Sequence, residues 1–262
     1  MEPDLTPLAY GLLAGITVLI GVLFMYYAKR RLNDGLLGVL QAMAGGILAY
    51  LALETGVAAM EYVESLAAWE TVGEFLLASI ATTLAFLGTF LVLTKVENAA
   101  IRGGWRQSMA IAFVIAAAFG VHNVGEGFAI AASMLTGAVG SAILFTIGFA
   151  IHNATEGFAI VGPLLTDRGV AIRPQSLLLL ALIAGLPTVA GVSVYYVGAV
   201  HGLFISILNT VANASIVYAL LHVNLGALAK LGGVSSPKFW TALTLGVAIA
   251  YTTESLLMLA GL

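Results

Sequence analysis

Eight long apolar stretches occupy most of this chain and restrict it to one kind of fold. They cover residues 8–28, 36–53, 72–93, 108–135, 139–165, 175–197, 203–225 and 239–259. A helix that crosses the ~30 Å hydrocarbon layer of a membrane needs about 20 such residues. Charged residues make up only 9% of the chain, whereas a soluble domain carries about 25%. We therefore predict an all-α integral membrane protein in which residues 1–262 form a single domain of eight transmembrane helices.

The basic residues predict which side of the membrane each loop faces. All ten follow an odd-numbered stretch: Lys29, Arg30, Arg31, Lys95, Arg102, Arg106, Arg168, Arg173, Lys230 and Lys238. Loops rich in Lys and Arg stay in the cytoplasm. These four loops, one of them at about 95–107, are therefore expected in the cytoplasm, and both termini are expected outside the cell.

The opposite side of the membrane is expected to be acidic. It carries Glu2, Asp4, Glu61, Glu64, Glu70 and Glu74. Residues 54–74, between the second and third stretches, hold five glutamates. This segment fits either a mouth that concentrates cations or a solvated loop or helix end.

A nine-residue sequence occurs twice with only two positions changed. The copies are HNVGEGFAI at 122–130 and HNATEGFAI at 152–160, each inside an apolar stretch. Polar and ionisable side chains are costly in a bilayer and commonly mark the path of a substrate or ion. His, Asn and Glu side chains are ligands for divalent metals. The repeat therefore predicts one site built from two helices.

The spacing within each copy places its polar groups together. The candidate metal ligands are His122, Asn123, Glu126, His152, Asn153 and Glu156. In each copy the His lies four residues and the Asn three residues before the Glu, so the three share a helix face. Both histidines lie ~21–24 Å from the turn near 137–140, at ~1.5 Å per residue, so the copies are expected to meet near mid-bilayer. Two metal sites bridged by a carboxylate would fit there; alternatively, the polar groups only join helices by hydrogen bonds.

These motifs resemble those of the ZIP (Zrt/Irt-like) family of divalent-metal transporters, which carry HNxPEG on their fourth and fifth membrane helices. Span number, orientation and motif position agree over essentially the whole chain. The resemblance implies a binuclear metal centre, movement of metal into the cytoplasm, an elevator-like motion of one helix group against another, and homodimers. Carried over by position, the first site would be lined by His122, His152 and Glu156. The second would be lined by Asn123, Glu126, Asn153 and Glu156.

The chain departs from the family pattern at three places. Gly125 and Thr155 stand where the two motifs have proline. On the sixth helix, Leu186 precedes Pro187 where the family often has Glu-Pro, which would remove a ligand of the second site. A methionine ligand of the family falls on Leu48. We therefore expect the first site to keep its His and Glu ligands and the second to be weaker.

A few further polar residues are candidates for ligands along an ion path. His222 would suit a ligand near the cytoplasmic exit, Glu54 a ligand at the outer entrance, and His201 either an entrance ligand or a solvent-exposed loop residue. Glu254 could simply extend to water at the outer end. One stripe in 203–225 would line a path or pack by hydrogen bonds: Ser206, Asn209 and Asn213.

The combined expectation is a transporter rather than an enzyme. Imidazole and carboxylate ligands suit Zn²⁺ best, with Fe²⁺, Mn²⁺, Co²⁺ or Cd²⁺ as alternatives, and the absence of cysteine excludes thiolate sites. The expected partners are the metal ion, the lipid of the cell (plasma or inner) membrane and a second copy of the chain. No prosthetic group and no nucleic acid are expected. Two other functions stay open: a proton- or sodium-coupled carrier of another substrate, and a membrane-embedded metalloenzyme.

Overall fold

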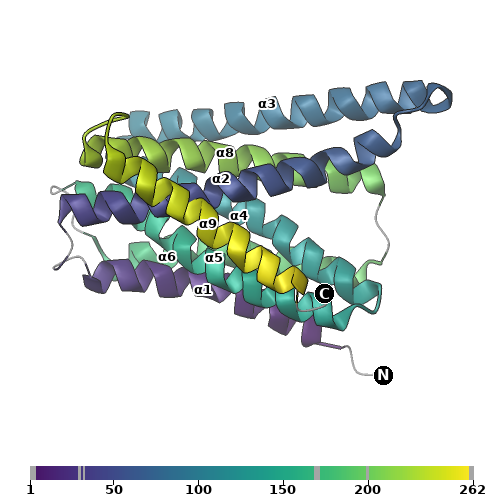
Figure 1. The fold of residues 1–262 in the computed structure, drawn as a ribbon, viewed down its shortest axis with the longest axis horizontal. Helices are drawn as coiled ribbons and strands as arrows, with labels where there is room; N and C mark the ends of the chain where they lie inside the picture. Colours follow the sequence, from purple (N-terminus) through teal and green to yellow (C-terminus); the bar gives the residue numbers. More distant parts are fainter. Residues whose placement is uncertain (1–3, 29–30, 32, 168–171, 199–200, 260–262) are drawn as a thin grey trace.

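The chain folds into a bundle of long helices, with no strand in the part that the structure covers (Figure 1). The computed structural model describes residues 4–28, 31, 33–167, 172–198 and 201–259, without the side chains of 256–258. Its helices are α1 (Thr6–Ala28), α2 (Asp34–Ser65), α3 (Val72–Arg102), α4 (Gln107–Leu135), α5 (Val139–Thr166), α6 (Pro174–Gly185), α7 (Pro187–Val192), α8 (Gly202–Leu231) and α9 (Pro237–Leu259), with short 3₁₀ turns η1 (Trp69–Thr71) and η2 (Ser193–Tyr196).

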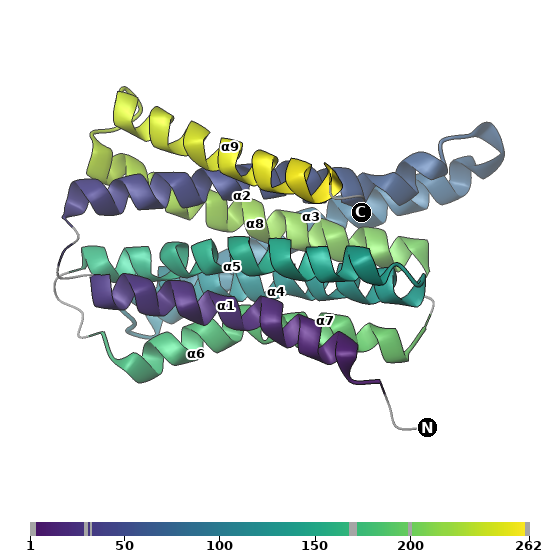
Figure 2. The same cartoon turned by 60° about the horizontal axis from the view of Figure 1, so that its bottom comes forward.

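The helices confirm a multi-pass membrane bundle. Seven helical segments are long and apolar enough to cross a membrane, with α6, α7 and η2 together forming one of them. α9 has 23 residues but is not among the seven. α1 begins toward one end of the bundle and α9 runs toward that same end, whereas the turns from α3 to α4 and from α8 to α9 lie at the other (Figures 1 and 2). Among the residues used for the orientation, Glu2, Lys29, Arg30 and Arg168 lie outside the described residues.

Two helices run well beyond their apolar stretches, and here the expected boundaries were wrong. α2 continues past residue 53 to Ser65, so Glu54, Glu61 and Glu64 lie on a helix. α3 continues to Arg102, which leaves only 103–106 of the expected loop at 95–107. Ala, Glu, Lys and Leu have high helix propensity, so a helix need not end where the hydrocarbon ends.

The bundle has two layers, and in Figure 2 the front helices α2, α8 and α9 of one lie above α1 and α5 of the other. One layer contains α2, α3, α8 and α9, with α2 packed against both α8 and α9. The other contains α1, α4, α5, α6 and α7, with α1 packed against α5 and α4 packed against α5 and α7. The layers meet chiefly where α4 contacts α8 and α2 contacts α5. The paired motifs on α4 and α5 therefore belong to one layer, and both helices contact the other layer.

Close contact inside the second layer depends on glycine. A Cβ built on Gly157 of α5 would lie 2.6 Å from the carbonyl carbon of Gly21 and 2.7 Å from the carbonyl oxygen of Val18, both on α1. Small residues let membrane helices approach to backbone contact. α1 therefore supports α5 directly beneath Glu156.

Candidate metal centre

The turn between α4 and α5 brings the two motifs level, as the spacing predicted. α4 ends at Leu135 and α5 begins at Val139, with Gly137 in the left-handed region at φ 78°. Glycine adopts this conformation without the steric cost of a Cβ. The ring centroids of His122 and His152 lie 6.2 Å apart. The described residues therefore place both motif histidines in one site.

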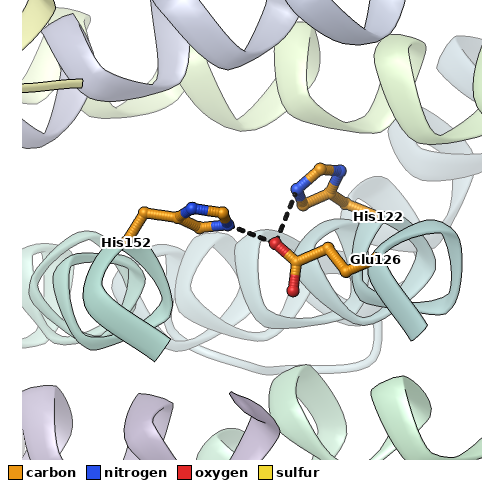
Figure 3. A group of neighbouring side chains, drawn as sticks. All are labelled: His122, Glu126 and His152. Atoms are coloured by element: carbon orange, nitrogen blue, oxygen red, sulfur yellow. Dashed lines mark hydrogen bonds and ion pairs between the residues drawn. The ribbon is translucent and has the colours of Figure 1, made fainter. Parts of the chain in front are cut away.

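Three side chains converge on one point in this site (Figure 3). The Oε1 atom of Glu126 lies 3.2 Å from Nε2 of His122 and also contacts Nε2 of His152. One ligand atom from each of the three residues lies within 4.8 Å of the other two. His122 and Glu126 are only 4% and 3% exposed. Two imidazole nitrogens and a carboxylate oxygen that meet away from solvent form a donor set suited to a divalent cation.

Each asparagine holds the glutamate of the opposite helix. Asn153 Nδ2 donates to Glu126 Oε2 at 2.9 Å, and Asn123 Nδ2 donates to Glu156 Oε2 at 3.2 Å. Because both amide groups present nitrogen to the carboxylates, their oxygens face elsewhere. These exchanged hydrogen bonds fix the positions of the carboxylates.

The site contains more buried acceptors than donors. Among the described residues, Oδ1 of Asn123, Oδ1 of Asn153 and Oε1 of Glu156 are buried without a hydrogen-bond partner. Neither ring nitrogen of His122 makes a hydrogen bond of good geometry there. Unpaired buried polar atoms cost about 1–3 kcal/mol each, more when charged. A cation can satisfy several such acceptors at once, whereas a further side chain can satisfy only one or two.

The grouping of ligands differs from that implied by the ZIP resemblance. The resemblance places Glu156 with the two histidines, but the carboxylate that contacts both rings is that of Glu126. Glu156 is 1% exposed and bonds to Asn123 instead. His122 and Glu126 share a helix face as predicted, but the decisive contact of Glu126 crosses to His152 on the neighbouring helix. Spacing within one helix cannot reveal such a contact.

A break in the sixth apolar stretch supplies the support for Asn123. Proline has no N–H, so α6 ends at Gly185 and α7 begins at Pro187. Near this break, the carbonyl oxygen of Ala184 accepts a 3.0 Å hydrogen bond from Asn123 Nδ2. Leu186 is 54% exposed, so position 186 does not face the buried site.

The other two departures also have clear surroundings. Leu48 is 2% exposed and belongs to the apolar core. Thr155, in place of a motif proline, donates from Oγ1 to the carbonyl of His152 at 2.7 Å. At Gly125 a Cβ would make ordinary van der Waals contact with α8, at 3.7 Å from Cβ of Ala212.

The polar stripe of α8 binds the backbone of α2. Ser206 donates to the carbonyl of Ala59, Asn209 to that of Ala58 at 3.4 Å, and Asn213 to that of Ala52. Of the two interpretations left open, hydrogen-bonded packing matches these contacts. The stripe therefore joins α8 to α2 within one layer.

The remaining histidines lie apart from the centre. His201 is exposed and caps α8 by accepting a hydrogen bond from the backbone N–H of Leu203 at 3.2 Å. His222 lies 3.1 Å from Oε2 of Glu97 on α3, and the Tyr218 hydroxyl donates to the same carboxylate oxygen. Glu97 lies beyond the apolar stretch at 72–93, so hydropathy alone does not predict its contact with α8.

A cavity of about 320 Å³ adjoins the centre and is lined by residues of α2, α4, α5 and α9. Its wall includes His152, Glu54 and Glu254. The Tyr50 hydroxyl donates to Glu254 Oε2 and so connects α2 to α9. We expected that Glu254 could simply extend to water, but its carboxylate is bonded to Tyr50 instead.

Comparison of the sequence with known protein families and with characterised proteins gave no match.

Proposed function

We propose that this protein transports divalent transition-metal ions, Zn²⁺ foremost, across a cell membrane by way of the His122–Glu126–His152 centre. The observation that carries the proposal is the convergence of two imidazole nitrogens on one carboxylate oxygen in a buried site. In this proposal, the buried and unpaired Oε1 atom of Glu156 is a candidate ligand for a second ion. Cations favour such sites because carboxylate and amide oxygens complete their coordination.

The two-layer bundle supports a transport mechanism of the ZIP type. In this proposal, eight spans place both termini outside and the four basic loops in the cytoplasm, following the distribution of Lys and Arg. The layer of α1, α4, α5, α6 and α7 carries the ion, and the layer of α2, α3, α8 and α9 stays fixed. Movement of the first layer past the second would expose the centre to each side in turn. A homodimer and a plasma or inner membrane location belong to the same proposal.

Uptake of Zn²⁺ into proteoliposomes tests this function. We expect saturable uptake by the wild-type protein, and a loss of at least ~10–100-fold in the His152→Ala/Glu126→Gln variant, because both changes remove ligands. The matched control is His201→Asn, which replaces an exposed histidine with another good helix cap.

Absence of Zn²⁺ and Cd²⁺ uptake by folded wild-type protein would refute the transport proposal. Equal uptake by wild type and the double variant would refute the assignment of the centre.

A further inference from the structure

The cavity beside the centre lies on one side of it only. Of the three side chains in the His122–Glu126–His152 centre, His152 alone lines the cavity. The cavity also borders Thr155 and Phe149 on α5, and the ring of Phe149 lies 5.5 Å from that of His152. His152 therefore stands between the cavity and the carboxylate of Glu126.

The charge of the cavity wall selects for cations. Its lining includes Glu54 from α2 and Glu254 from α9, and it includes no Lys or Arg among the described residues. Most of the other lining residues are apolar, such as Ile47, Leu144 and Phe145. Apolar walls strengthen the field of a carboxylate, and clefts of one charge sign raise the local concentration of the opposite ion. The wall thus attracts cations and repels anions.

Tyr50 holds the carboxylate of Glu254 in place. Tyr50 donates its hydroxyl to Oε2 of Glu254, and its ring packs edge-on against Tyr251 with centroids 6.1 Å apart. This bond engages one oxygen of Glu254. Both rings are rigid, so Glu254 is fixed in the wall although it comes from the last helix of the chain.

We propose that this cavity is the outer capture site of the protein, in which Glu54 and Glu254 bind a divalent cation before His152 passes it to the centre. The inference rests on the proposed transport function and adds to it the side from which the ion arrives, between α2, α5 and α9. Carboxylates suit this step because their negative charge attracts the cation, and imidazole and carboxylate together then hold it in the centre. Glu254 and Glu54 act here as substrate-binding residues outside the centre.

Transport kinetics give the first test. In proteoliposomes with Zn²⁺, we expect Glu54→Gln and Glu254→Gln to raise KM by about 10-fold, in line with electrostatic focusing, and to change the maximal rate little. Glu64→Gln, on the exposed end of α2 and outside the cavity, is the matched control and should behave like the wild type. Glu254→Asp, which keeps the charge, should lie between the wild type and Glu254→Gln. Wild-type KM values in the Gln variants would overturn the inference while leaving the transport function intact.

A second test does not depend on transport. The chain has no cysteine, so Ser141→Cys places a single thiol in the cavity wall. Relative to a free thiol in solution, we expect this cysteine to react about 10-fold faster with a cationic than with an anionic methanethiosulfonate. Cd²⁺ should slow both reactions, and Glu54→Gln/Glu254→Gln should abolish the preference for the cationic reagent. No preference in the Ser141→Cys protein would overturn the inference even if wild-type uptake were normal, and a preference without uptake would refute transport but not cation capture.

Discussion

Glycine residues on either side of Glu126 give a sharp test of how the centre is built. A Cβ on Gly127 would lie 2.7 Å from the backbone nitrogen of Val192 and 3.0 Å from Cα of Gly191, both on α7. A Cβ on Gly125 would meet nothing closer than 3.7 Å. Ordinary van der Waals contact begins at about 3.5 Å, so Gly127→Ala must separate α4 from α7 while Gly125→Ala need move nothing.

The two substitutions should therefore change the free energy of unfolding in opposite directions: Gly127→Ala should lower it and Gly125→Ala should raise it. Overpacking costs about 1–3 kcal/mol, and the obstructing atoms at Gly127 belong to a backbone that cannot rotate aside. Gly125→Ala should gain a few tenths to about 1 kcal/mol from helix propensity. The difference of about 1–4 kcal/mol corresponds to roughly 3–16 °C in Tm for a chain of this size. Thermal unfolding in detergent, followed by circular dichroism and by retention of the monodisperse peak, measures it.

The affinity for Zn²⁺ should fall in Gly127→Ala and not in Gly125→Ala. Gly127→Ala shifts the helix segment that carries Glu126, so we expect weaker Zn²⁺ binding in that variant and near wild-type binding in Gly125→Ala. Equal Tm values for the two variants would refute the close packing of α4 on α7. Equal Tm values would also remove the physical reason for glycine at 127.

Three further predictions follow from the same contacts. Asn123→Ala should lose about 1–3 kcal/mol of stability and bind Zn²⁺ more weakly, because it leaves buried acceptors at Glu156 and Ala184 unpaired. The control Asn213→Ala should also lose stability but keep the wild-type Zn²⁺ affinity, measured by isothermal calorimetry. Zn²⁺ at 100 times its Kd should stabilise the wild-type protein by about 2.7 kcal/mol, seen as a rise in Tm that is absent in His152→Ala. Arg106, whose pKa is raised by its hydrogen bonds to Asp167, is 57% exposed, so Arg106→Ala should leave the denaturant midpoint close to the wild-type value, because water screens exposed ion pairs. A large fall in that midpoint would show that the Arg106–Asp167 pair is a main support of the fold.

Much of the architecture could be predicted because membrane insertion leaves few options. Apolar runs of about 20 residues predict spanning helices, and the turn near 137–140 predicted the level at which the two motifs meet. The ends of α2 and α3 could not be predicted from hydropathy, because polar residues with high helix propensity continue a helix into water. For this reason hydropathy did not place Glu97 on a helix.

The centre was predictable in its members but not in its contacts. Six polar residues in two copies of one motif pointed to one site, and all of them except His122 bond across α4 and α5 in ways that helix periodicity cannot show. Whether Glu126 or Glu156 faces the histidines depends on the rotation of each helix, which packing against α1 and α7 determines. The cavity needed three-dimensional information as well, since Glu54 and Glu254 are 200 residues apart in the sequence.

Anomalous scattering at the zinc absorption edge, from crystals of the wild-type protein grown with Zn²⁺, would locate the bound metal. We predict a peak at the convergence point of His122, Glu126 and His152, with zinc–nitrogen distances of about 2.0–2.1 Å to both Nε2 atoms. A weaker second peak near Glu156 would fit the unpaired oxygens there. Zinc peaks that all lie elsewhere, or no peak at this point at saturating Zn²⁺, would show that His122, Glu126 and His152 do not form the metal centre.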